Sequence, residues 1–158
     1  MNLKNIKIFS QNVRKNSLII HTILETCSTF NIIFIQELSW TYICSIPSLS
    51  NYDSEELVGV LNYPNWITFS RTLTQSHDSL RVIIYINTHI LFLYFSLHND
   101  LFNHRDISCI SFFNHGLIYY LFNVYSDSSQ SALIFEILTF STIPFIGILF
   151  LISPISFS

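Results

Sequence analysis

Two polar residues near the N-terminus stand at the ends of apolar segments. Glu37 closes the run IIFIQE, and Asn12 follows the alternating run IKIFS. An ionised carboxylate in apolar surroundings is costly unless something pairs with it. Mg²⁺ binds a carboxylate oxygen together with several waters, and an amide beside it can orient that shell. Glu37 and Asn12 are therefore candidates for half of a magnesium site; the alternative is that Glu37 is a strand-end residue in water.

These two residues meet only if the segments that carry them are neighbouring strands. Residues 6–10 alternate and predict a strand, whereas residues 31–36 form a continuous apolar run typical of a strand buried on both faces. Residues 18–27, between them, predict a helix. A strand–helix–strand unit favours a parallel pair, and α/β sheets place their sites at the carboxyl ends of parallel strands. We therefore expect Asn12 and Glu37 at the same edge of a sheet.

The rest of the chain predicts several more strands. They are expected at residues 66–70, 81–87, 90–97, 106–113 and 117–125. Asn87 and Thr88 lie at a turn position, which predicts a hairpin between the second and third of these strands. The polar, turn-rich residues 47–64 predict a surface loop with at most one short helix. Antiparallel strands after a parallel start predict an α/β fold of layered sheets.

The composition limits the classes of function. Half of the 158 residues are hydrophobic, only 11% are charged, and the net charge is −3, so no global positive field attracts nucleic acid. A small basic cluster near the N-terminus contains Lys4, Lys7, Arg14 and Lys15. It is either a solvated face or a contact for a DNA backbone.

The three scattered cysteines show no metal-ligand spacing, and the N-terminus has no signal-peptide pattern. Both observations favour an intracellular, non-secreted protein, nuclear or cytoplasmic.

The C-terminal segment has a different character. Residues 137–158 carry no charge and are long enough to span a bilayer. Two prolines, one glycine and several hydroxyl residues interrupt this segment, and no Lys or Arg flanks it. We therefore divide the chain into residues 1–133 and a hydrophobic tail, residues 134–158, that is either a buried terminus or a membrane segment at 137–157.

The order of the motifs resembles a known superfamily. KIFSQN ends a first strand, IIFIQE ends a second, RVIIYIN follows a variable loop, and ISFFNHGLIYYLFNVYSDSS ends in an Asn-x-Tyr motif. Over residues 6–133 this order resembles the endonuclease/exonuclease/phosphatase superfamily, most closely the endonuclease domains of non-LTR retrotransposons. The resemblance implies a layered β-sandwich flanked by helices, here incomplete.

The resemblance also implies site residues. Glu37 matches the principal Mg²⁺ ligand, and Asn12 matches the Asn that orients the metal and phosphate shell. Tyr125 matches the Tyr that hydrogen-bonds the scissile phosphate region, and Asn123 matches the partly structural Asn of the same motif. The implied catalytic set is therefore Asn12, Glu37, Asn123 and Tyr125, acting with Mg²⁺ on a DNA phosphodiester.

The family's later motifs are missing from this chain. Its Gly-Asp-x-Asn segment and terminal Asp-His pair have no counterpart, because Glu136 is the only acidic residue after Asp127 and no His follows His115. We therefore interpret the chain as a truncated, retroelement-derived copy with weak or no activity, and hypothesise that it leaves the ancestral reading frame or exon near Leu133. The alternatives are a small membrane-associated protein and a non-catalytic interaction module on the same sheet.

Overall fold

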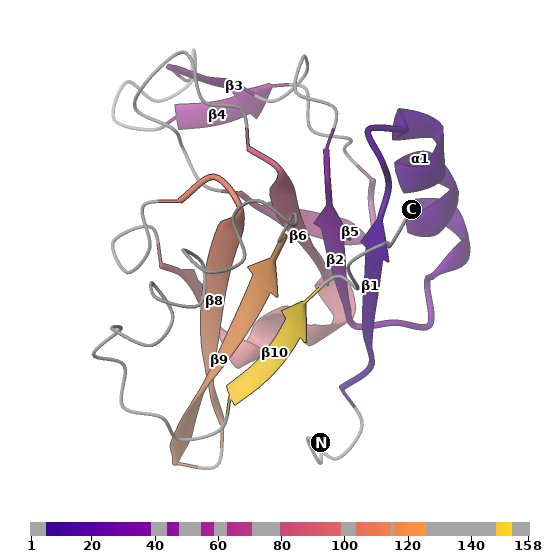
Figure 1. Cartoon of the computed structure of the whole chain (residues 1–158). Helices are drawn as coiled ribbons and strands as arrows, with labels where there is room; N and C mark the ends of the chain where they lie inside the picture. The colour runs from indigo at the N-terminus through magenta and orange to yellow at the C-terminus, as the bar shows by residue number, and fades with distance from the viewer. Residues whose placement is uncertain are drawn as a thin grey trace.

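The computed structural model describes two four-stranded sheets and one long helix (Figure 1). The described residues are 6–38, 44–47, 55–58, 63–70, 80–98, 104–114, 116–125 and 148–152. From one edge to the other, the strands of the first sheet are β1 (Ile8–Asn12), β2 (Ile32–Gln36), β6 (Val82–Asn87) and β5 (Trp66–Phe69). From edge to edge, the strands of the second sheet are β10 (Ile148–Ile152), β9 (Leu117–Val124), β8 (Ile107–Asn114) and β7 (Phe95–Leu97).

The two sheets pack face to face around a common apolar core. Phe34 and Ile84 of the first sheet share one buried cluster with Ile110 and Leu121 of the second. Alternate residues of an antiparallel strand point to the same face, so a strand can supply this core while its other residues face outward. The predicted α/β fold of layered sheets is thereby confirmed.

Helix α1 (Ser17–Thr26) covers the other face of the first sheet. The Asn16 side chain accepts a hydrogen bond from the Leu18 N–H at 3.0 Å and so caps the helix start. Ile20 and Ile23 of the helix pack against Ile33 and other residues of the first sheet. Every residue of β2 is buried, as the continuous apolar run predicts, because β2 faces the helix on one side and the second sheet on the other.

Strands β1 and β2 are parallel neighbours, as the strand–helix–strand pattern predicts. In their register, Ile8 pairs with Ile32 and Asn12 pairs with Gln36. Asn12 is therefore level with the residue that precedes Glu37. This register places the carboxyl ends of the two strands at the same end of the sandwich.

The hairpin predicted at Asn87 and Thr88 is wrong. The chain instead forms a 3₁₀ helix, η3 (Thr88–Leu93), which leads from β6 in the first sheet to β7 in the second. The Asn87 Oδ1 accepts a hydrogen bond from the His89 N–H at 3.0 Å, which favours this turn over a hairpin. The buried side chains of Ile90 and Leu93 join the core between the sheets, so part of the predicted strand 90–97 is a core-filling connection.

One other expectation for the chain differs from the structure, and part of the C-terminal tail is described. The loop predicted at 47–64 contains a strand, β4 (Glu55–Val58), which pairs with β3 (Cys44–Pro47). Part of the hydrophobic tail forms β10, which pairs in parallel with β9. Residues 134–147 and 153–158 of that tail lie outside the described part of the chain. Within the described part, no helix is long and apolar enough to cross a bilayer.

Candidate functional site

Main-chain hydrogen bonds join five polar segments at one end of the sandwich. We call this end the rim, and define it as residues 12–16, 36–38, 81, 104–106 and 125. The N–H donors and carbonyl acceptors of these bonds are Lys15 to Glu37 (2.8 Å), Leu38 to Arg81 (3.2 Å), Arg81 to Arg105 (3.1 Å) and Tyr125 to Asp106 (2.9 Å). Because Arg81 precedes β6 and Arg105 precedes β8, these bonds connect both sheets at the rim.

Asn12 lies at the last position of β1 and is half-buried. Its side-chain Oδ1 accepts a hydrogen bond from the Arg14 N–H at 2.9 Å, which closes a local turn. Paired residues of parallel strands, and residues two apart in one strand, share a face. Asn12 thus lies on the same face as Gln36 and Ser10, the face that packs on the second sheet.

Glu37 follows β2 directly and is half-buried, with a left-handed backbone at φ 55°. Arg14 and Lys15 also have positive φ values, 48° and 62°. A non-glycine residue in this conformation is strained, and such strain is frequent at functional sites. The Lys15 N–H donates a hydrogen bond to the Glu37 carbonyl, and this bond joins the two strained turns at the rim.

Tyr125 follows β9 and reaches the rim from the second sheet. Its N–H donates to the Asp106 carbonyl at 2.9 Å, and the Arg81 guanidinium carbon lies 4.6 Å from the centre of its ring. Tyr125 thus lies at the same end of the sandwich as Asn12 and Glu37, although it comes from the other sheet.

Asn123 is buried completely, between the two sheets. Its Nδ2 donates to the carbonyls of Ile35 and Ile83 at 3.0 and 2.9 Å, and its Oδ1 accepts a hydrogen bond from Gln36 Nε2 at 2.7 Å. These bonds leave its amide committed to the protein interior. The structure therefore gives Asn123 a structural position behind the rim, apart from the other three predicted site residues.

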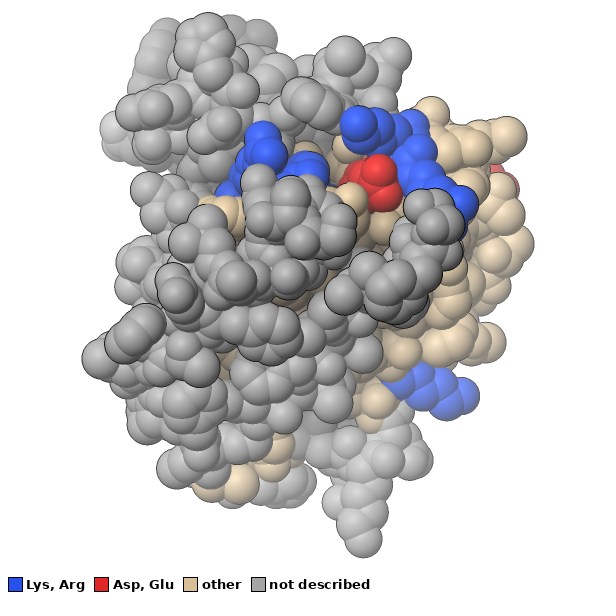
Figure 2. Space-filling view, in the orientation of Figure 1, with Lys and Arg blue, Asp and Glu red and all other residues tan. Residues whose placement is uncertain are grey.

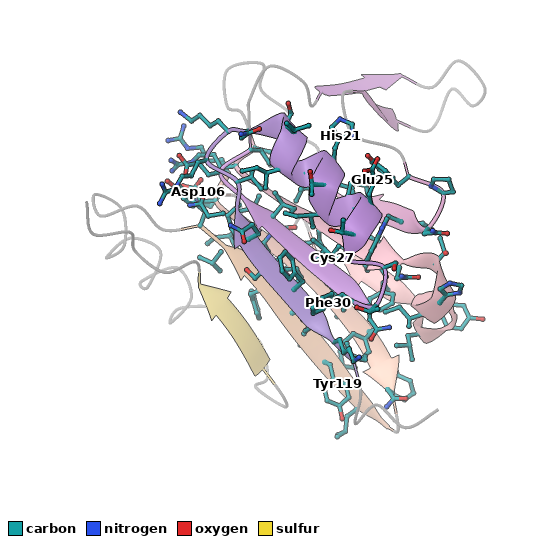
Figure 3. The ribbon with its side chains drawn as sticks, turned by 90° about the vertical axis from the view of Figure 1, so that its right-hand side faces the viewer. His21, Glu25, Cys27, Phe30, Asp106 and Tyr119 are labelled. Atoms are coloured by element: carbon teal, nitrogen blue, oxygen red, sulfur yellow. The ribbon has the colours of Figure 1, made fainter. Side chains whose placement is uncertain are left out.

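An Arg–Asp pair was not identified from the sequence as part of the site. Asp106 has no exposed surface, and two N–H groups of Arg81 bind its two carboxylate oxygens. The His104 Nδ1 and the Arg105 Nε lie 3.7 and 4.0 Å from Asp106 Oδ2. The available signal was weak: each residue of the pair is a charge placed immediately before an apolar strand. Figure 3 shows Asp106 at the end of the molecule where α1 begins.

Basic side chains surround a carboxylate on the surface at this end of the molecule (Figure 2). Arg14 and Lys15 are exposed, and Arg105 is about one-third exposed (34%). Locally gathered cations attract an anion even when the whole chain is acidic. The rim therefore suits a phosphate group better than the net charge of −3 suggests.

The donor set at the rim fits a partial Mg²⁺ site. In the described ranges, no group of three or more His, Cys, Asp or Glu side chains could hold a metal ion. A phosphate-bound Mg²⁺, however, needs only one or two carboxylates, because waters and phosphate oxygens complete its shell. Glu37 offers one carboxylate, and Asn12 offers an amide oxygen at the end of the neighbouring strand.

The fold and the rim define the chain as a mixed α/β sandwich with polar residues gathered at the carboxyl ends of a parallel strand pair. Among solved structures, it is similar to the endonuclease domain of TRAS1, a telomere-specific non-LTR retrotransposon. The TM-score is 0.57 at 13% sequence identity, over 85% of this chain and 51% of that chain. This likeness confirms the inferred resemblance at the level of the fold.

The similarity has a defined extent. The chain spans about half the length of the TRAS1 structure that it matches. No protein-family model matches the chain, and no curated protein matches it. At this identity the likeness concerns the fold, so the chemistry must be argued from the residues at the rim.

Proposed function

We propose that the chain is an endonuclease-like domain of the non-LTR retrotransposon type, whose rim binds Mg²⁺ and a DNA phosphodiester and hydrolyses it weakly or not at all. The observation that supports this most is the position of Asn12, Glu37 and Tyr125 at the same end of the sandwich. Asn12 ends β1, Glu37 follows β2 and Tyr125 follows β9, so all three lie at the strand ends where an α/β sheet places its ligands.

Five rim residues have specific roles in this proposal. Glu37 and Asn12 would hold Mg²⁺, which supplies positive charge beside the phosphate. The Tyr125 hydroxyl donates a hydrogen bond to a phosphate oxygen, and Arg14 and Lys15 attract the neighbouring phosphates of the strand. Together these contacts bind and orient a phosphodiester.

The proposed activity is weak because these 158 residues contain no counterpart of the family's proton-transferring Asp-His pair. A well-placed general acid or base contributes about 10²- to 10⁴-fold to a rate. No His follows His115, and Glu136 is the only acidic residue after Asp127, so this chain lacks the Asp-His pair that the resemblance calls for. We therefore expect the chain to bind metal and phosphate even where it does not hydrolyse the phosphodiester.

The experiment measures metal binding and DNA nicking separately. Mn²⁺, a spectroscopic substitute for Mg²⁺, is titrated into the chain and free ion is measured by electron paramagnetic resonance; nicking of supercoiled plasmid is then followed with Mg²⁺. Glu37→Ala should abolish the Mn²⁺ site and any nicking above background. Glu25→Ala, at an exposed acidic residue on α1, is the matched control and should change neither. Equal Mn²⁺ binding by wild type and Glu37→Ala would refute the proposal.

A further inference from the structure

Arg81 lies between two of the candidate site residues. Its carbonyl accepts a hydrogen bond from the N–H of Leu38, the residue directly after Glu37, at 3.2 Å. Its guanidinium carbon lies 4.6 Å from the centre of the Tyr125 ring. Arg81 is therefore in contact both with the segment that carries Glu37 and with the side chain of Tyr125.

Asp106 holds this guanidinium in place. The Arg81 Nε and Nη2 groups donate to the two separate oxygens of the Asp106 carboxylate, and only 13% of the Arg81 side chain is exposed. A planar guanidinium bound at two points cannot rotate freely. Asp106 also accepts the main-chain hydrogen bond of Tyr125, so one residue fixes both the backbone of Tyr125 and the cation over its ring.

We propose that Arg81 is a positioning residue for Tyr125. The buried Asp106 carboxylate orients the guanidinium, and the guanidinium holds the Tyr125 ring in one orientation at the rim. The contact itself is a property of the structure; its consequence for phosphate binding rests on the proposed function. Arg81 acts here through Tyr125 and has no assigned contact with the phosphate.

The geometry requires arginine rather than lysine. A guanidinium can bind a carboxylate with one edge and lie flat over an aromatic ring with its face at the same time. A lysine ammonium is a compact charge that can pair with Asp106 but cannot form both contacts in this way. Arg81→Lys therefore keeps the charge beside the buried carboxylate and removes the constraint on the ring.

The first test measures the ring directly and needs no activity. The full chain is labelled with 3-fluorotyrosine at its eight tyrosines, and Tyr125→Phe identifies the Tyr125 resonance in the ¹⁹F NMR spectrum. Arg81→Lys should shift this resonance and narrow it, because the ring becomes mobile. Lys7→Gln, at an exposed residue outside the rim, should leave it unchanged. An unchanged Tyr125 resonance in folded Arg81→Lys would overturn the proposal.

A second variant keeps this test decisive if Arg81→Lys does not fold. The double variant Arg81→Gln with Asp106→Asn removes both charges, so no buried charge is left unpaired. It should shift the Tyr125 resonance in the same direction as Arg81→Lys. A folded double variant with the wild-type resonance would likewise overturn the proposal.

The second test connects the contact to phosphate binding. Each protein is titrated into a fluorescein-labelled DNA duplex with Mg²⁺ present. The four proteins are wild type, Arg81→Lys, Tyr125→Phe and the double variant Arg81→Lys with Tyr125→Phe. Arg81→Lys should weaken binding roughly 3- to 10-fold in the wild-type background and less than about 2-fold in the Tyr125→Phe background, because coupled residues are not additive. Equal losses in both backgrounds would show that Arg81 does not act through Tyr125. If wild type binds no DNA, the proposed function fails, while the ¹⁹F spectrum still decides the positioning role.

Discussion

The side-chain amide of Gln36 donates a hydrogen bond to Asn123 Oδ1 across the interior, at 2.7 Å. Gln36 ends β2 and Asn123 lies in β9, so this bond joins the two sheets directly behind the rim. Glu37 is the next residue after Gln36, and Tyr125 is two residues after Asn123. The bond therefore fixes the relative position of the strand ends that carry two candidate site residues.

Asn123→Leu is expected to destabilise the fold strongly. The substitution removes the two hydrogen bonds from Asn123 to the carbonyls of Ile35 and Ile83 and the one that it accepts from the Gln36 amide. A buried polar group that loses its hydrogen bond costs about 1–3 kcal/mol, so the free energy of unfolding should fall by at least about 3 kcal/mol. Urea denaturation measures this change.

Ser108→Ala is the matched control for Asn123→Leu. Ser108 pairs with Asn123 in the β8–β9 register and is also buried, but its hydroxyl makes no hydrogen bond among the described residues. Removing an unsatisfied hydroxyl should change stability by less than about 1 kcal/mol. Similar losses for both variants would show that the Asn123 bonds do not hold the sheets together.

The parts of the fold predicted correctly from the sequence depend on local patterns. The apolar run of β2, the alternation of β1 and the helix between them are each encoded within a few residues, and their connection favours a parallel pair. The shared edge of Asn12 and Glu37 follows from that pair alone. Neither inference needed knowledge of distant residues.

The features that were missed depend on contacts between distant residues. A turn at Asn87 and Thr88 is present, but its neighbours in three dimensions decide that β6 and β7 belong to different sheets. Arg81 and Asp106 are 25 residues apart, and nothing in either local sequence identifies the other as its partner. Pairing across the two sheets is set by packing, which sequence periodicity does not encode.

Glu37→Gly is expected to stabilise the fold relative to Glu37→Ala while removing the proposed metal ligand. At φ 55° a residue with a Cβ is strained by roughly 1 kcal/mol, and glycine is not. Both variants lose the carboxylate, so the difference between their free energies of unfolding reports the backbone strain alone. Chemical denaturation should show the glycine variant about 1 kcal/mol more stable. Equal stabilities would exclude backbone strain at this position.

Lys15→Gly and Lys15→Ala separate strain from metal binding. Lys15 has a similar φ of 62° and is exposed. The glycine variant should again be the more stable of the two, by about 1 kcal/mol. Neither variant removes a carboxylate, so Mn²⁺ binding should survive in both. Loss of the metal in Lys15→Gly would imply that the turn, rather than Glu37, forms the site.

Tyr63 should make the fold sensitive to alkaline pH. Partial burial, followed by the nearby Glu25 carboxylate, raises the pKa of Tyr63 above 10.0. The folded chain then holds this proton more tightly than the unfolded chain, so stability falls as the pH rises from about 10 through the folded value. Melting temperatures measured from about pH 8 to pH 11 should fall less steeply in Tyr63→Phe than in wild type. Tyr94→Phe, whose residue is 86% exposed, should follow wild type, and parallel curves for all three proteins would contradict the linkage.

Proline substitutions in β10 test whether this part of the hydrophobic tail belongs to the domain. Leu149 and Phe150 pair with Leu121 and Phe122 of β9, and consecutive N–H groups of a strand point to opposite sides. Only one of the two positions therefore donates to β9. Proline there removes a ladder hydrogen bond and should lower the free energy of unfolding by about 1–3 kcal/mol, whereas proline at the other position should cost clearly less. Urea denaturation distinguishes them, and wild-type stability in both variants would mean that the strand adds nothing to the sheet.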